Sequence, residues 1–250
     1  MLSIKSIDKF FGNRQVLFGI TMDLMPGKAN LIIGRSGSGK TVLMKCLAGL
    51  LMPENGEILF DGRQFDERHD PKTVNEIRRD IGMVFQGGAL FDSQTVLENV
   101  IFPLDMFSRM TRAEKHERAH DCLKRVGLEN VDRLYPSELS GGMRKRVAIA
   151  RAIVNTPKYL FCDEPNSGLD PQTSARIDAL IAEITEEYQT TTVINTHDMN
   201  SVLQYGDLVH FIFEGKRWWT GNRHTILEAD DPELRRFLEA SELTKRLLHA

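Results

Sequence analysis

A glycine-rich segment at residues 34–41 has the residue types and the spacing that bind phosphate. It consists of Gly34, Arg35, Ser36, Gly37, Ser38, Gly39, Lys40 and Thr41. Glycines let backbone N–H groups turn toward an anion without a Cβ clash, and a helix start adds its positive end. Lys40 supplies a mobile charge for the outer phosphates, and Thr41 offers a hydroxyl to Mg²⁺. An apolar strand at 31–33 precedes the segment and a helical pattern at 41–51 follows it, so we predict a nucleotide phosphate loop.

An acidic pair, Asp163 and Glu164, follows the apolar run at residues 159–162. Asp163 is expected to hold Mg²⁺ directly or through water. Glu164 is expected to point elsewhere, because side chains alternate along a strand, and to deprotonate the water that attacks the γ-phosphate. An ordinary turn at a strand end would also explain the pair alone. Lys40 at another predicted strand end favours the catalytic interpretation.

Two further polar residues, Gln86 and His197, follow predicted strands at 81–85 and 190–195. The carboxyl ends of parallel strands meet at one edge of a sheet, where ligands bind. A lone histidine is more often structural than catalytic. Here four candidate residues each follow a predicted strand, namely Lys40, Gln86, Glu164 and His197, which favours a catalytic role. His197 is predicted to hydrogen-bond the γ-phosphate and the attacking water.

The predicted elements indicate an α/β fold. Residues 2–24 resemble an antiparallel β subdomain, and the strand–helix–strand alternation at 159–220, with a helix at 171–188, predicts a mostly parallel sheet covered by helices. Residues 95–155 are predicted to be helices, which indicates an inserted helical subdomain. The charged segment 66–80 is predicted to be a solvated linker and helix.

Composition excludes several classes of protein. Hydrophobic residues make up 41% of the chain and charged residues 27%, as in ordinary globular proteins. The net charge of −3 gives no electrostatic case for nucleic acid. No apolar run approaches the roughly 18 residues of a spanning helix. The three cysteines fit neither a disulfide framework nor a zinc site and indicate a reducing, cytosolic compartment.

A second glycine motif identifies the family that the chain resembles. Residues 139–143 read Leu-Ser-Gly-Gly-Met at the start of a predicted helix. Ser140, Gly141 and Gly142 can form an anion cradle there, and the helix is predicted to present apolar residues on one side and the basic residues Arg144, Lys145, Arg146 and Arg151 mainly on the other. With the phosphate loop and the acidic pair, this motif resembles the ATP-binding-cassette (ABC) ATPases.

The resemblance implies roles for further residues and an arrangement of two chains. Phe11 matches the aromatic residue that stacks on adenine, with Phe10 as the alternative, and Gln86 matches the glutamine that joins the metal site to the helical subdomain. Asp170 ends the loop 167–170 that crosses the dimer in this family. Two copies would sandwich two ATP molecules with Mg²⁺, the serine–glycine cradle of each copy serving the ATP of the other. The resemblance implies an ATPase domain at 1–225, with the helical subdomain at about 88–155, and a helical tail at 226–250.

The methionine of the signature narrows the resemblance. Met143 replaces the usual glutamine. The segments 138–143, 88–92, 99–104 and 231–238 resemble the Mla/Mce branch, whereas the segment 166–170 is closer to generic cassettes. This branch implies phospholipid transport between the two membranes of bacteria. The implied partners are an MlaE-like permease, an MlaB-like regulatory subunit and a periplasmic Mce-type subunit, with this chain peripheral at the cytoplasmic face of the inner membrane. The alternatives are an importer of a small polar solute and a soluble cassette protein acting on nucleic acid or ribosomes, the latter disfavoured by the net charge.

Two apolar stretches allow two interpretations each. Residues 87–106 could form the core of the helical subdomain or a groove for a permease helix. In the tail, Asp231 is predicted to cap a helix whose strip of Leu234, Phe237 and Leu238 is later joined by Leu247 and Leu248. That strip could pack on its own domain or contact another subunit.

Overall fold

The computed structural model describes residues 1–66 and 70–248. The chain divides into two compact units. The first comprises Met1–Arg78 and Thr191–Ala250, and the second comprises Arg79–Thr190. Within the predicted charged segment 66–80, residues 67–69 lie outside the described residues, and a helix, α2 (Pro71–Arg79), follows them.

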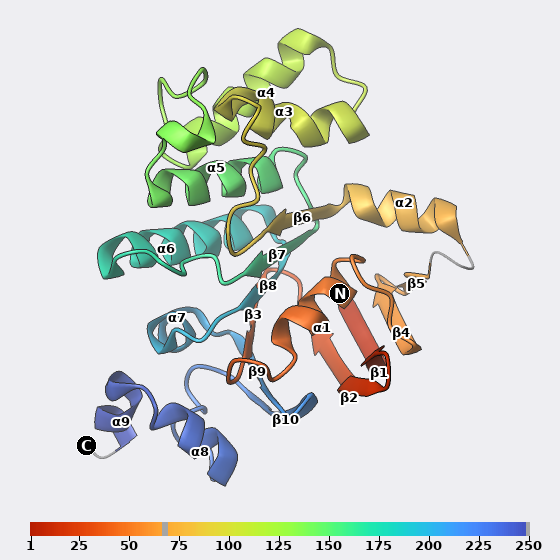
Figure 1. The fold of residues 1–250 in the computed structure, drawn as a ribbon, viewed down its shortest axis with the longest axis vertical. Coiled ribbons are helices and arrows are strands. Elements are labelled where there is room, and N and C mark those ends of the chain that lie inside the picture. The colour runs from red at the N-terminus through yellow and green to blue at the C-terminus, as the bar shows by residue number, and fades with distance from the viewer. Residues whose placement is uncertain (67–69, 249–250) are drawn as a thin grey trace. The chain divides into compact units, whose positions relative to one another are not determined.

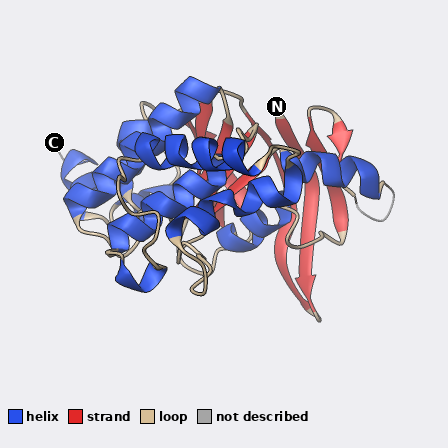
Figure 2. Cartoon of the chain, turned by 90° about the horizontal axis from the view of Figure 1, so that it is seen from above, coloured by secondary structure: helices blue, strands red, loops and turns tan. Residues whose placement is uncertain are grey.

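The first unit begins with an antiparallel sheet, as predicted. Its strands, which include the N-terminus (Figures 1 and 2), are β1 (Leu2–Phe11), β2 (Arg14–Leu24), β4 (Asn55–Phe60) and β5 (Arg63–Gln64), in the order β2-β1-β4-β5. Leu2, Ile4 and Ile7 of β1 are buried. Ser6 has a φ of +51°, and the pairing of β1 with β2 shifts between Ile4 and Ile7, so a bulge bends the strand while keeping these apolar side chains inside.

The same unit contains buried parallel strands. In Figure 1, β3 (Lys28–Ile33) lies between β8 (Thr191–Asn195) and β9 (Leu208–Phe213), parallel to both, and β10 (Lys216–Gly221) pairs antiparallel with β9. The helix α1 (Lys40–Leu47) follows β3 and ends before the predicted residue 51, because Gly49 takes a left-handed φ of +71°. A short helix, α7 (Met199–Tyr205), was not predicted.

The second unit contains the predicted helical stretch. Two parallel strands, β6 (Ile81–Val84) and β7 (Tyr159–Asp163), accompany α3 (Val96–Phe107), α4 (Arg112–Arg125), the 3₁₀ helix η1 (Pro136–Glu138), α5 (Gly141–Ile153) and α6 (Pro171–Tyr188). Reciprocal capping bonds between Thr95 and Glu98 begin α3, and the same pattern begins α4. These elements confirm the predicted α/β class. None of the described helices is both long and apolar enough to span a membrane.

Two of the basic residues predicted to lie mainly opposite the apolar side of α5 are buried. Lys145 and Arg151 are only 6% and 8% exposed. These charged side chains can be buried because each donates to a backbone carbonyl of another segment.

The tail forms two helices, α8 (Pro232–Leu238) and α9 (Glu242–Leu248). As predicted, the side chain of Asp231 caps α8, accepting a hydrogen bond of 2.8 Å from the backbone N–H of Leu234. Leu234 and Leu238 are fully buried, and the Phe237 ring lies 5.3 Å from that of Phe211 in β9. The apolar strip of α8 therefore packs on its own unit, whereas Leu247 is 47% exposed and does not join it. A domain boundary at residue 225 stays a prediction.

Truncation of Phe237 tests how strongly the tail contributes to the first unit. Phe237→Ala is expected to lower the free energy of unfolding by about 3 kcal/mol, because a buried ring is replaced by a cavity. Denaturant unfolding followed by the fluorescence of Trp218 and Trp219 measures this change, since both lie on β10 and Trp218 donates to Asp231 at the start of α8. Leu247→Ala is the matched control, with an expected change within about 0.5 kcal/mol. Equal small effects for both variants would show that α8 adds little stability.

Candidate functional site

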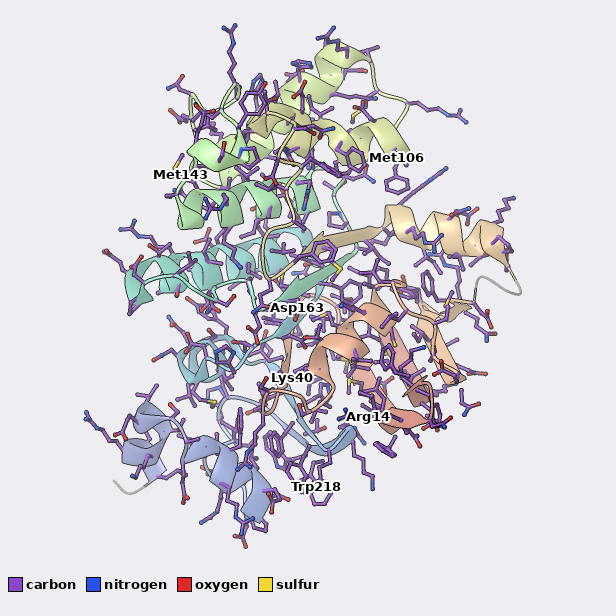
Figure 3. All side chains as sticks on the ribbon, in the orientation of Figure 1. Arg14, Lys40, Met106, Met143, Asp163 and Trp218 are labelled. Carbon is purple, nitrogen blue, oxygen red and sulfur yellow. The ribbon has the colours of Figure 1, made fainter. Side chains whose placement is uncertain are left out.

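In the phosphate loop of the first unit, the lysine side chain hydrogen-bonds the main chain of the loop. Lys40, at the start of α1 (Figure 3), is 7% exposed, and its Nζ donates to the carbonyls of Gly34 and Arg35 at 2.8 and 3.0 Å. The backbone N–H of Ser38 donates to the Arg35 carbonyl, and Gly39 has a φ of +103°, which a residue with a side chain rarely adopts. The loop therefore holds the ammonium group and the positive helix end beside the same turn.

Two features of this loop fit a phosphate group. A Cβ placed on Gly34 would lie 2.3 Å from the Ile212 carbonyl oxygen and 2.8 Å from Ser38 Oγ, so only glycine allows this close approach. Within the part of the chain that the structure describes, Ser38 Oγ is buried and has no hydrogen-bond partner. A buried hydroxyl without a partner is costly, and a bound anion oxygen would satisfy it.

Two other predicted residues of the first unit come from neighbouring elements. Phe11, at the end of β1, is 48% exposed, and Lys9 Nζ lies 5.5 Å from the centre of its ring, whereas Phe10 is half-buried. An exposed ring is the better stacking platform, which supports Phe11 over Phe10. His197 follows β8, where the Thr196 N–H donates to the Ile32 carbonyl of β3 at 3.2 Å. The histidine thus follows its strand at the same edge as the phosphate loop.

The second unit brings Gln86 and Glu164 together. Gln86 Nε2 donates to Glu164 Oε2 at 3.0 Å; Gln86 is exposed and Glu164 is half-buried. Asp163 ends β7 and is 6% exposed. Glu164 has a φ of +45°, the left-handed region that a residue with a side chain seldom occupies. Its direction therefore comes from a left-handed turn and not from the alternation of strand side chains that the sequence suggested. Such strain persists where the surroundings hold it and is concentrated at functional sites.

The signature motif begins α5. Ser140 is the N-cap residue, and its Oγ accepts a hydrogen bond of 3.2 Å from the Met143 N–H. A Cβ on Gly142 would lie 2.8 Å from Thr173 Cγ2, and one on Gly141 would lie 3.4 Å from a Leu169 methyl group. The glycines thus allow the start of α5 to pack against Leu169, which precedes α6, and Thr173, which lies in the first turn of α6. Only the backbone of Met143 takes part in the cap, which fits the replacement of the usual glutamine.

A cavity of about 630 Å³ adjoins the signature. Its walls include the serine–glycine cradle, the acidic residues Asp170 and Glu183, and the basic residues Arg125, Arg146 and Arg176, of which Arg125 pairs with Glu183 at 3.2 Å. Asp170 caps α6 by accepting from the Thr173 N–H at 3.0 Å, and its hydrogen bonds with Thr173 lower its pKa. Burial, and then the charge of Arg176, lower the pKa of Arg146. The guanidinium groups of Arg146 and Arg176 favour an anionic ligand in this cavity.

Two contacts of α5 were missed by the sequence reasoning. Lys145 Nζ donates to the backbone carbonyl of Gln86 and to that of Glu164, the latter at 3.3 Å. The guanidinium of Arg151 donates to the carbonyls of Gly88 and Ala89, both at 2.8 Å. Burial lowers the pKa of both basic groups. A signal was available, because Lys145 shares a helical face with the apolar residues 148, 149 and 152.

A buried polar pair was also missed. Asn166 Nδ2 donates to the two carboxylate oxygens of Asp178 in α6 at 3.2 and 3.1 Å, and both residues are about nine-tenths buried. The Ser174 hydroxyl adds a bond of 3.3 Å to the Asn166 carbonyl. These contacts hold the loop before Asp170. Cys162 beside them is fully buried, and burial raises its thiol pKa, as expected of a core residue.

The predicted site residues thus form two groups, one in each unit. Residues 34–41, Phe11 and His197 belong to the first unit, whereas Gln86, Asp163, Glu164, the signature and Asp170 belong to the second. That both groups act on one nucleotide stays a prediction.

The sequence matches a known family and is similar to several named proteins. A sequence profile of the ABC transporter family matches residues 17–167. A probable ribonucleotide transport ATP-binding protein, mkl, of Mycobacterium leprae is 37% identical over 97% of this chain and 70% of its own length. The methionine import ATP-binding protein MetN of Clostridium tetani is 37% identical over 97% of this chain and 76% of its own. The intermembrane phospholipid transport ATP-binding protein MlaF of Haemophilus influenzae is 35% identical over 96% of this chain and 90% of its own.

Solved structures show the same fold. The ATP-binding cassette MJ0796, a dimer in a post-hydrolysis state bound to ADP and Pi, has a TM-score of 0.81 and 33% sequence identity, covering 89% of this chain and 99% of that one. The cassette cbiO1 of Clostridium perfringens, part of the transporter complex cbiONQ, has a TM-score of 0.82 and 32% identity, covering 99% of this chain and 97% of that one.

Proposed function

The chain belongs to the ABC transporter family as an ATP-hydrolysing subunit, and we propose that its hydrolysis drives phospholipid transport of the Mla/Mce type. The observation that carries the substrate class is the Leu-Ser-Gly-Gly-Met signature, together with the Mla/Mce-like segments 88–92 and 99–104 that precede it in the chain. The MlaF relative supports the same class across 96% of the chain. This assignment places the protein peripherally at the cytoplasmic face of the inner membrane.

We assign the chemical roles as follows. The loop 34–41 cradles the phosphates of ATP, with Lys40 at the β and γ phosphates and Phe11 against adenine. Thr41, Gln86 and Asp163 would hold Mg²⁺, which neutralises phosphate charge when bound. Glu164 accepts the proton of the attacking water, and His197 hydrogen-bonds that water and the γ-phosphate.

The second copy of the chain supplies the other half of each site. In the proposed homodimer, the residues Ser140, Gly141, Gly142 and Asp170 face the ATP bound to the phosphate loop of the partner. The serine N-cap at the start of α5 and the side chains of Arg146 and Arg176 in the adjoining cavity support an anion there. The dimeric MJ0796 cassette supports the arrangement by similarity.

The permease is proposed to bind an apolar surface at the end of α3. This α3 surface consists of Phe91, Phe102, Met106, Phe107 and Met110, which are 36% to 62% exposed. The rings of Phe91 and Phe102 lie 4.7 Å apart, and Met106 is labelled near the end of α3 in Figure 3. Residues Val96, Val100 and Leu104 of the same helix are buried. The apolar stretch therefore divides into a core side and an exposed side, and an MlaE-like permease helix would cover the exposed side. The MlaB-like and Mce-type subunits belong to the same proposed complex.

A second candidate is the ATPase of an importer for a small polar solute. The MetN relative favours it, because its 37% identity is as high as that of any relative described above. A conserved motor architecture serves many substrates, so the motor residues do not separate the two candidates.

Purification of the complex from detergent-solubilised membranes tests the substrate class and the docking surface together. The tagged chain is expected to bring a multi-span permease that carries phospholipid, identified by mass spectrometry and by lipid phosphorus analysis. Met106→Glu is expected to lose the permease and its lipid while the isolated subunit keeps its ATPase rate, since a charge on a buried apolar interface is costly. The matched control, Met25→Glu, replaces a methionine that is 46% exposed in the first unit and should retain both.

The opposite outcomes are equally distinct. A permease without phospholipid, whose complex hydrolyses ATP faster with methionine, would favour the importer. Retention of the permease by Met106→Glu would exclude the α3 surface as its main contact.

A further inference from the structure

We propose that Lys145 is a positioning residue that couples the signature helix α5 to the carboxylate of Glu164. The inference rests on the proposed role of Glu164 as the base and goes beyond it. Lys145 has no assigned part in nucleotide or metal binding. It acts through the backbone of two residues that do.

The contacts form a closed set within the second unit. The ammonium group of Lys145 reaches the backbone carbonyls of both Gln86 and Glu164, and the Gln86 side chain in turn donates to the Glu164 carboxylate at 3.0 Å. Lys145 thus binds the main chains of the two residues whose side chains bond each other. Because it is 6% exposed, water does not easily replace these bonds.

The backbone of Glu164 needs such support. Its left-handed φ of +45° is unfavourable for a residue with a side chain and persists only where neighbours hold it. Lys145 holds the Glu164 carbonyl, at the end of that strained residue. Arg151, six residues further along α5, holds the carbonyls of Gly88 and Ala89, which follow Gln86 in the chain. The signature helix α5 therefore hydrogen-bonds the main chain of residues 86–89 and that of Glu164.

Through Lys145, this arrangement connects α5 to the main chain of Glu164, the proposed base. Ser140 caps the helix, and Lys145 projects from its second turn. When the cap region binds a phosphate, a shift of the rigid helix moves the ammonium group and hence the main chain of Glu164. The geometry predicts that removing the ammonium group slows the chemical step without weakening ATP binding.

The test compares Lys145→Met with the wild type in steady-state hydrolysis of MgATP. We expect kcat to fall about tenfold and KM for ATP to stay within about twofold, because the binding loop lies elsewhere. Lys145→Arg retains donors at the end of the side chain and is expected to recover most of the rate. If kcat is unchanged in Lys145→Met while Glu164→Gln loses ATP hydrolysis, the positioning role of Lys145 is wrong and the role of Glu164 as the base still holds.

A double-mutant cycle separates positioning from a general structural effect. In the Glu164→Gln background, adding Lys145→Met is expected to cause no further loss, because both changes act on one step. A further tenfold loss there would show that Lys145 acts independently of Glu164 and would overturn the proposal. Near-normal hydrolysis by Glu164→Gln alone would instead remove the proposed base, and with it the premise.

Matched measurements control for folding. Lys158→Met removes an exposed lysine that pairs with Asp80 at 2.9 Å in the same unit, and it should leave kcat and the melting temperature unchanged. Should Lys145→Met fail to fold, Lys145→Gln, which keeps a donor on a shorter side chain, takes its place. The expected fall in kcat is then about threefold with KM unchanged, and an unaltered kcat overturns the proposal.

Discussion

Glu164→Gln is expected to reduce ATP hydrolysis by about 10²- to 10³-fold while leaving ATP binding intact, because an amide cannot accept the proton of the attacking water. The substitution preserves the shape of the side chain, and an amide oxygen can still accept the hydrogen bond from Gln86 Nε2. Release of inorganic phosphate measures the rate, and equilibrium titration with ATP measures binding. With hydrolysis stopped, ATP should also trap the homodimer, which size-exclusion chromatography detects.

Glu186→Gln is the matched control. This substitution makes the same chemical change at an exposed position of α6, in the same unit. The variant should hydrolyse ATP at the wild-type rate. Near-normal turnover by Glu164→Gln would reject the assignment of Glu164 as the base. Loss of ATP binding would show that the Glu164 carboxylate contributes to binding ATP and not to the hydrolysis step.

Ser140→Arg is expected to lower ATP hydrolysis by at least about 10²-fold, because it places a large side chain over the cradle proposed to bind the partner's ATP. The effect should act between copies. In the Glu164→Gln background, the added Ser140→Arg should bind ATP with unchanged affinity, since residues 34–41 are untouched, yet fail to form the ATP-dependent dimer. Loss of the helix cap itself should cost only about 1 kcal/mol of stability.

Ser93→Arg controls for the added charge and bulk, since Ser93 is exposed in the same unit and lies outside the signature. It should dimerise and hydrolyse ATP normally. If Ser140→Arg hydrolyses ATP at the wild-type rate, the sandwich with the signature in the partner's site is wrong. Weakened ATP binding by the isolated subunit would place the cradle on the chain's own nucleotide.

The order of elements was largely predictable because short-range rules govern it. The apolar strand, glycine turn and helix around residues 28–47 carry their own signals, and α6 begins and ends where its proline and its apolar periodicity indicate. The cap of α8 at Asp231 is equally local. The ABC family followed from motifs whose residues lie within a few positions of one another. The substrate class did not, because the motor is shared by relatives named for ribonucleotide, methionine and phospholipid transport.

By itself, the sequence determined the phosphate loop, the acidic pair, the signature and the α/β class, since each depends on residue types at short spacing. Only the tertiary structure decided what holds those residues in place. Lys145 reaches Gln86, 59 positions away, and Asn166 finds Asp178 on the next helix. The prediction from the sequence treats α5 by itself and groups Lys145 with the basic residues opposite its apolar side. The carbonyls that make its burial favourable come from other segments, and only folding brings them within hydrogen-bond distance.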